Sequence, residues 1–126
     1  MSETFDFVEL KHNARISAAK RSEWVYLRRY SGPTVRRYIA TRKPTPTELA
    51  HTFFFVEDYA EAAGCSMPYA RRQLTALARA GFIEKRNTAG GATAWFFCDS
   101  EDTELIGRRI IKKLRREGLV FDDYKI

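Results

Sequence analysis

A succession of helix starts and stops between Phe55 and Cys98 restricts how this chain can fold more than any other feature. An alanine-rich run at 56–63 is followed by Gly64, and glycine readily adopts the left-handed conformation that ends a helix. Ser66 then provides a good N-cap, and Pro68 fits the first turn of the next helix. The pattern therefore predicts two short helices joined by a tight turn.

The second of these helices is predicted to end at Gly81, with a strand beginning at Phe82. A glycine-rich tip at 89–92 and an aromatic strand at 93–98 then complete a hairpin. The aromatic strand is expected to be buried on both faces, with base stacking by its rings as the alternative. The inward positions of the second helix recur at helical spacing and are Ala70, Leu74 and Leu77.

On either side of this segment, further helices are predicted. A helix is expected over 14–30, and a second begins near Pro33. Residues 45–48 fit a capping box for a short helix through about Phe53, although the apolar run at 53–55 could instead form a brief strand. A last helix is expected from a cap at 99–103 to about Glu117. Its apolar stripe either completes the core of one chain or seals a dimer, and consists of Ile106, Ile110 and Leu114.

The net charge of +6 is unevenly distributed along the chain. Residues 11–43 carry ten Lys or Arg and a single acid, Glu23, whereas Lys and Arg balance Asp and Glu after residue 43. An excess of positive charge on one segment favours a polyanionic partner. The alternative is a basic surface that is simply solvated.

Taken together, these motifs resemble the winged helix-turn-helix of bacterial regulators of the MarR, ArsR and GntR kind. The resemblance covers about 45 residues and rests on Tyr59-Ala60, Gly64-Cys65-Ser66, Arg72-Gln73-Leu74, Leu77 and Ala80-Gly81-Phe82-Ile83. Phe55 departs from the family, in which Thr or Ser often caps the first helix of the pair. The chain also lacks the Cys or His cluster of an ArsR-type metal sensor, so no subgroup is assigned.

The resemblance implies a fold of the α+β class that is mostly α: a winged helix-turn-helix with additional N-terminal helices and a C-terminal helix. One compact domain is expected, with a basic helical arm at 1–44, the winged helix-turn-helix at 45–98, and an amphipathic helix with a tail at 99–126.

By position, the resemblance also implies DNA-contacting residues on the outer face of the second helix and on the wing. Arginine suits the O6 and N7 atoms of guanine, and glutamine suits adenine. Ser66 and Tyr69 are expected to reach phosphates, with packing under the wing as the alternative for Tyr69. The residues predicted to contact DNA are Ser66, Met67, Tyr69, Arg71, Arg72, Gln73 and Thr75 on the helix, and Lys85, Arg86, Asn87 and Thr88 on the wing.

Nothing in the sequence predicts catalysis, a cofactor or a small-molecule ligand. The spacing of Cys65, Cys98, His12 and His51 does not resemble the paired short spacings of structural zinc sites, so no metal is expected. No apolar run approaches the length of a transmembrane helix, and the acidic N-terminus is unlike a secretion signal. A cytoplasmic protein is therefore expected.

The function that the resemblance implies is sequence-specific binding of double-stranded DNA by a transcriptional regulator, acting as a homodimeric repressor. The alternative is a winged-helix module for protein interaction or assembly in a replication or phage-encoded complex, because a fold does not fix a function.

Overall fold

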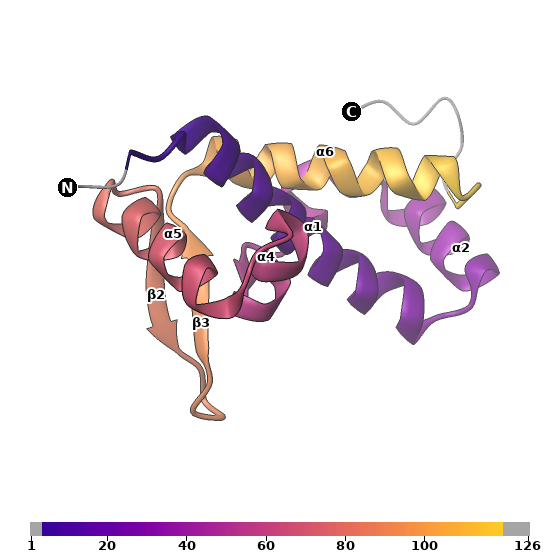
Figure 1. Ribbon diagram of the computed structural model, residues 1–126. Helices are drawn as coiled ribbons and strands as arrows, with labels where there is room; N and C mark the ends of the chain where they lie inside the picture. Colours follow the sequence, from indigo (N-terminus) through magenta and orange to yellow (C-terminus); the bar gives the residue numbers. More distant parts are fainter. Residues whose placement is uncertain (1–3, 120–126) are drawn as a thin grey trace.

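The computed structural model describes residues 4–119, apart from the side chains of residues 23–28. Residues 1–3 and the predicted tail at 120–126 lie outside the described residues. The chain is mostly helical and has one small three-stranded antiparallel sheet, so the expected α+β class is confirmed at this level. In order, the elements are α1 (Phe7–Arg29), α2 (Gly32–Arg42), α3 (Pro46–Leu49), β1 (Phe53–Phe54), α4 (Val56–Ala63), α5 (Met67–Arg79), β2 (Ile83–Asn87), β3 (Thr93–Phe97) and α6 (Ser100–Arg116) (Figure 1).

The sheet has the order β1-β3-β2, and β3 pairs with both neighbours. Phe54 lies opposite Trp95 in one pairing, and Lys85 lies opposite Trp95 in the other. Phe53 and Phe54 therefore form a strand, the second of the two predicted alternatives, and the preceding helix ends at Leu49 instead of near Phe53. The aromatic strand is buried only in part, because Trp95 is buried whereas Phe96 and Phe97 are half-buried.

Helix α4 has the bounds that the sequence predicts, and α5 begins after the predicted cap at Ser66 but ends at Arg79, just before the predicted stop at Gly81. Gly64 has a φ of 66°, in the left-handed region, and ends α4. The Ser66 hydroxyl oxygen accepts a hydrogen bond from the Tyr69 backbone N–H at 3.3 Å, which caps α5. Phe55 has no side-chain acceptor, and its own backbone N–H donates to the Asp58 carboxylate at 2.8 Å. The acid in the first turn therefore stabilises the start of α4 although Phe55 has no side-chain cap to offer.

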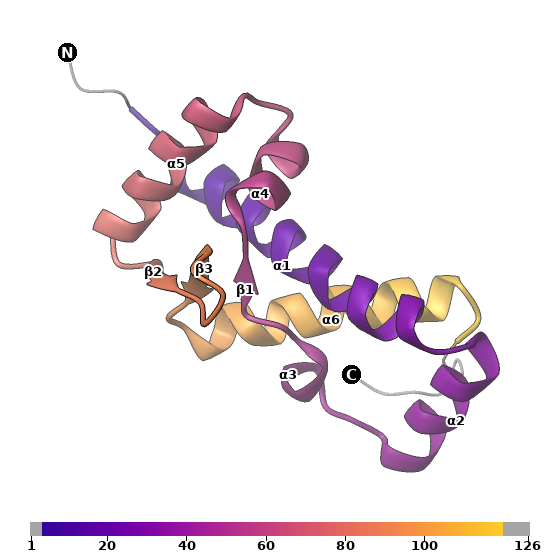
Figure 2. The ribbon, with the colours of Figure 1, turned by 90° about the horizontal axis from the view of Figure 1, so that it is seen from below.

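Helix α1 begins at Phe7, seven residues before the predicted start, because the Asp6 carboxylate caps it by accepting from the Val8 N–H at 3.1 Å. The helix contacts α4, α5, α6 and β1, so its buried face belongs to the central core (Figure 2). Among the described side chains of α1, the fully buried ones are small: Ala14, Ser17, Ala18 and Ser22. Small residues allow the neighbouring helices to approach α1 closely.

Helix α6 lies along α1 and α3 and closes the core on the side opposite α4. Gly107 faces α3, where a Cβ atom would lie 1.7 Å from the Pro46 carbonyl oxygen. The predicted stripe of α6, Ile106, Ile110 and Leu114, is at most 2% exposed within the single chain. Of the two alternatives for this stripe, the structure therefore places it in the core of one chain.

Candidate nucleic-acid interface

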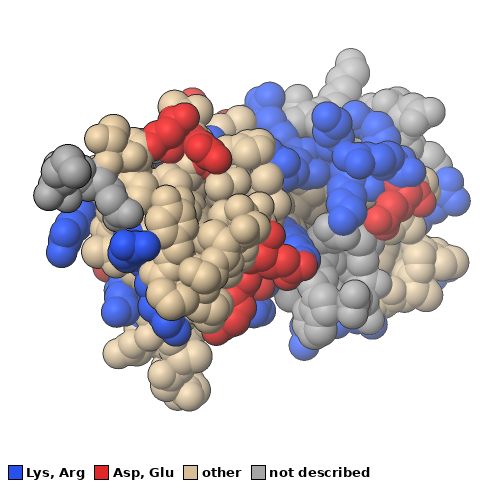
Figure 3. Space-filling model, viewed as in Figure 1, with Lys and Arg blue, Asp and Glu red and all other residues tan. Residues whose placement is uncertain are grey.

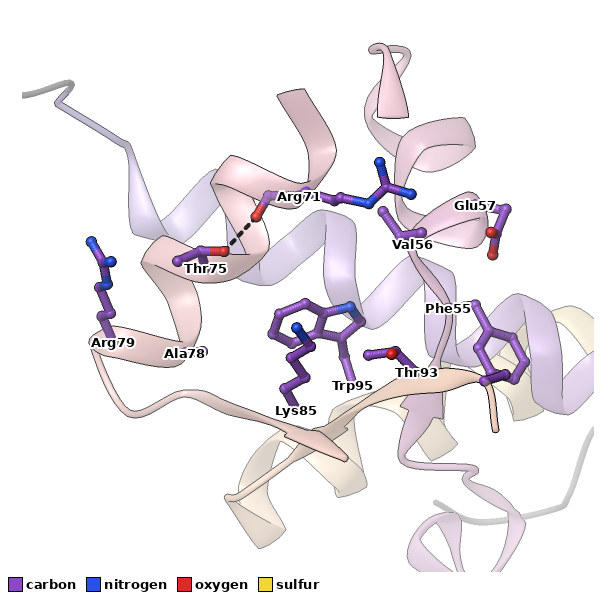
Figure 4. Close-up of a pocket in the computed structure, with 11 residues that line it drawn as sticks. Phe55, Val56, Glu57, Arg71, Thr75, Ala78, Arg79, Lys85, Thr93 and Trp95 are labelled. Carbon is purple, nitrogen blue, oxygen red and sulfur yellow. Dashed lines mark hydrogen bonds between the residues drawn. The ribbon is translucent and has the colours of Figure 1, made fainter. Parts of the chain in front are cut away.

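A groove of about 820 Å³ runs between α5 and the β2–β3 hairpin. Three cationic side chains line it: Arg71 and Arg79 from α5, and Lys85 from β2. In Figure 4 the Arg71 side chain extends from α5 toward Val56 and Glu57 of α4, and Arg79 lies at the other end of the helix. Positive charge is thus supplied to the groove from both of its walls.

The positions of these cations follow from the periods of their elements. Arg71, Thr75 and Arg79 recur every four residues, so they share one face of α5. The two arginines are separated by about 12 Å along the helix axis, at 1.5 Å per residue. On β2, side chains alternate between faces, so Lys85 shares the face of Ile83, which is buried. Lys85 therefore points to the same side of the sheet as α5.

Trp95 forms the floor of this groove and is only 6% exposed. The Lys85 ammonium lies 5.8 Å from the centre of the indole ring, near the outer limit for a cation–π contact. Thr75 donates its hydroxyl proton to the Arg71 backbone carbonyl oxygen at 2.8 Å. Its methyl group and the Ala78 side chain leave the α5 wall partly apolar between the two arginines.

Arg72 lies on the exposed side of α5 next to this groove. Its guanidinium stacks on the Tyr69 ring at 5.0 Å from the ring centre. Together with Arg71 and Arg79 it also borders a shallow depression that contains Phe5 and Phe7 of the N-terminal segment. Arg71 and Arg72 are both exposed, so neither is masked by another part of the described chain.

Two of the residues predicted to lie on the outer face of α5 are placed differently. Gln73 is half-buried, and its amide oxygen accepts a hydrogen bond from the Tyr59 hydroxyl at 2.7 Å. Met67 is partly buried against the core. The reason is helical geometry: Gln73 is three residues from Ala70 and four from Leu77, so it borders the buried stripe. Burial raises the pKa of Tyr59 from 10.0 to about 12, so its hydroxyl stays protonated further into the alkaline range.

The hairpin separates two residues that were predicted to act together. Arg86 lies on the face opposite Lys85, pairs with Glu84 at 2.9 Å, and stacks over Phe96 at 5.1 Å from the ring centre. The hydrogen bond and charge of Arg86 lower the pKa of the Glu84 carboxyl. Arg86 is therefore turned away from the groove, whereas Asn87 shares the face of Lys85. The Thr88 backbone N–H is used within the turn, where it donates to the Ala92 carbonyl at 2.7 Å.

Arg79 and Thr93 line the groove but were not predicted as site residues. Arg79 had a signal in the sequence, since it continues the four-residue spacing of Arg71 and Thr75. The acidic side of the site is α4, which exposes Glu57 and Glu61. In Figure 3 a patch of acidic side chains lies near the middle of the molecule over α4, with basic side chains on both sides of it. Negative charge is thus concentrated on α4, and positive charge on the hairpin side of α5.

Among the side chains that the structure describes, no group of three His, Cys, Asp or Glu is arranged to hold a metal ion. Cys65 and Cys98 are free thiols. No helix within residues 4–119 has the length and apolar character needed to cross a membrane.

Comparisons with protein families, with curated proteins and with solved structures give no match for this chain.

Proposed function

We propose that this chain is a sequence-specific double-stranded DNA-binding protein of the winged-helix kind that regulates transcription. In this proposal α5 enters the major groove and the β2–β3 hairpin is the wing that follows the backbone. The observation that carries the proposal is the groove in which Arg71, Arg79 and Lys85 converge. None of the three forms an ion pair with a carboxylate among the described side chains, so their charge is available to a ligand.

The chemistry of the groove suits a DNA backbone with some base readout. Guanidinium groups donate in pairs to phosphate oxygens and to the O6 and N7 atoms of guanine. Arg72 and Arg71 on the exposed face of α5 are the proposed base-reading residues, and Lys85 is the proposed phosphate contact. The methyl group of Thr75 can lie against the methyl group of thymine. Arg86 pairs with Glu84 and is turned away from the groove, so it is not one of the proposed DNA contacts of a single chain.

We propose a homodimer that acts as a repressor, since one short helix and three cations offer few contacts and a palindromic site doubles them. The α6 stripe is used within one chain, so the interface belongs on other apolar side chains. Tyr30 and Tyr38 are 54% and 43% exposed and share a small pocket with Val35. These residues are the proposed centre of the interface.

The test is selection of bound sequences from a pool of random duplexes, combined with the mass of the complex in solution. A preferred sequence is expected, and a palindromic one if the protein binds as a dimer. Arg72→Ala is expected to relax the preference and to cost about 1–3 kcal/mol of binding free energy. Retention of both affinity and preference in this variant would falsify the assignment of α5. Failure of the wild-type protein to bind any duplex at moderate salt would favour the alternative, an assembly module.

A further inference from the structure

A second groove, of about 560 Å³, lies between α1 and α6. Seven of its twelve lining residues are Lys or Arg, and none is Asp or Glu. Arg15 and Lys20 come from α1. The α6 wall supplies Arg108, Arg109, Lys112, Lys113 and Arg116. This groove is thus more basic than the groove beside α5, which has three cations and one acid.

The cations differ in how they are held. Arg15 pairs with the buried carboxylate of Asp102, and Lys20 pairs with Glu61 of α4. These two pairs fix the α1 wall. On α6, Lys112 and Arg116 form no ion pair with a carboxylate among the described side chains, and the Arg109 guanidinium lies 3.4 Å from Nδ1 of His12. Arg108 on the same wall pairs with Glu104, whereas Arg109, Lys112 and Arg116 are all exposed and form no ion pair with a carboxylate among the described side chains.

Spacing along α6 suits a chain of phosphates. Arg109, Lys112 and Arg116 are three and four residues apart, so they form one row on the helix. The row covers about 10 Å along the axis, at 1.5 Å per residue. One strand of a duplex presents a phosphate about every 3.4 Å along its axis, so the row can face about three phosphates.

The apolar lining argues against an amphipathic acidic helix as the occupant. Such a partner inserts apolar anchors into a hydrophobic groove. Of the apolar lining residues, Ala19 and Ile110 are at most 6% exposed, Ile16 is half-buried, and Leu105 is the exposed large one, at 41%. Two neighbouring side chains, Ile16 and Leu105, are thus the apolar surface left for anchors to cover. Seven of the twelve lining side chains are cationic, which suits a backbone of phosphates contacted from one side.

We propose that the α1–α6 groove is a second nucleic-acid-binding site, which holds the phosphate backbone of a further nucleic-acid segment without reading its bases. The second half of α6 lies on the side of α2, away from α5 and the hairpin (Figure 1). In Figure 3 the basic side chains over this half of α6 lie apart from the α5 end, with uncharged surface and the acidic patch over α4 between them. The two sites therefore face different segments, and this site does not depend on the function proposed for α5.

The test uses the full chain with the α5 site disabled by Arg71→Gln, Arg72→Gln and Lys85→Gln. The probe is a random 20-base-pair duplex at low salt. Residual binding is expected in this background. Adding Arg109→Gln, Lys112→Gln and Arg116→Gln is expected to reduce that binding at least tenfold. It should also reduce the slope of log affinity against log salt by about 2–3, since each phosphate contact contributes about 0.9.

The matched control removes the same charge outside both grooves, by Arg29→Gln, Arg37→Gln and Arg42→Gln, and should weaken binding less than threefold. Equal losses in the two triple variants would overturn the proposal, because overall charge would then explain the binding. Displacement of the duplex by polyglutamate at equal charge concentration would also overturn it, in favour of an acidic polypeptide.

A second measurement needs no substitution. In the wild-type protein, bound duplex should protect Lys112 from acetylation and leave Lys43, the C-cap residue after α2, reactive, as read by mass spectrometry. Equal reactivity of Lys112 with and without duplex would overturn the site. Loss of sequence preference in Arg72→Ala with protection of Lys112 retained would separate this site from the proposed role of α5.

Discussion

The two basic grooves of this protein differ in what surrounds their charge. The groove beside α5 combines three cations with a threonine methyl group, an indole floor and an acid at one end. The groove between α1 and α6 has seven cations, no acid in its lining and one large exposed apolar side chain, Leu105. A surface of mixed chemistry can distinguish one base from another, whereas a row of cations recognises only phosphate. Charge density alone would therefore not identify a base-reading surface.

The grooves also differ in how they are built. The α5 groove lies between a helix and a hairpin that are adjacent in sequence, so residues within 55–95 form it. The α1–α6 groove joins residues 12–20 to residues 105–116, so its geometry depends on long-range packing. Substitutions that loosen the packing of α1 or α6 should therefore damage the second groove before the first.

The largest effect is expected from the ion pair that joins the walls of the second groove. The Asp102 side chain is 4% exposed and that of Arg15 is 19% exposed. Asp102→Ala leaves the Arg15 charge largely buried without its partner, which should lower the free energy of unfolding by about 3–5 kcal/mol. Urea denaturation measures the loss. The matched control on the same helix is Glu104→Ala, whose pair with Arg108 is about half exposed and should contribute less than about 1 kcal/mol. Equal losses would show that the buried pair does not hold α1 to α6.

The next largest effect is expected where α6 packs against α3, at Gly107. In Gly107→Ala the new Cβ would overlap the Pro46 backbone, so α6 must move away from α3. Overpacking of this kind should cost about 1–3 kcal/mol, measured by thermal or urea denaturation. Gly90→Ala is the control, because a Cβ there meets no atom within 4 Å. If Gly107→Ala were as stable as this control, the contact between α3 and α6 would not be as tight as described.

The elements around α5 could be predicted from sequence because their signals are local. Gly64 and Ser66 act within one turn of the chain, and the stripe of Ala70, Leu74 and Leu77 is apolar at helical spacing. The winged-helix interpretation was drawn from the same residues and stays a prediction. The buried side of α1 could not be read in this way, because two of its core residues are serines.

Ser17 and Ser22 satisfy their hydroxyl groups inside the fold, so polar residues occupy core positions. The Ser17 hydroxyl donates to the Asn13 carbonyl at 2.7 Å, and Ser22 Oγ accepts from the His51 backbone N–H at 2.6 Å. The second of these bonds joins residues 29 positions apart, which no periodicity can reveal. Gln73 is a similar case, since its partner Tyr59 belongs to another helix.

A smaller effect should distinguish the two faces of the hairpin. Lys85→Ala removes a groove cation and should weaken binding of every duplex by about 1 kcal/mol, with the salt slope reduced by about 1. Arg86→Ala changes a side chain that is turned to the other face and paired with Glu84, so affinity should stay within twofold of the wild type. Fluorescence anisotropy over a range of salt concentrations measures both. A larger loss in Arg86→Ala than in Lys85→Ala would reverse the assignment of the faces, and would support the prediction from sequence that Arg86 contacts DNA.

The smallest effect on stability is expected from the hydrogen bond between Tyr59 of α4 and Gln73 of α5. Tyr59→Phe removes the hydrogen bond to Gln73 and keeps the buried ring, so stability at pH 7 should fall by only about 0.5–1 kcal/mol. The pKa of Tyr59 is raised from 10.0 to about 12 in the folded protein. The contribution of its protonated hydroxyl to the free energy of unfolding is therefore fully present below pH 10 and is lost as the pH rises through about 12. Between these values the unfolded chain ionises the phenol and the folded chain does not. Wild-type stability, measured by urea denaturation, should therefore fall more steeply above pH 10 than that of Tyr59→Phe. Parallel curves would mean that the Tyr59 hydroxyl is solvated in the folded protein, and Gln73 would then be free to turn toward the α5 groove.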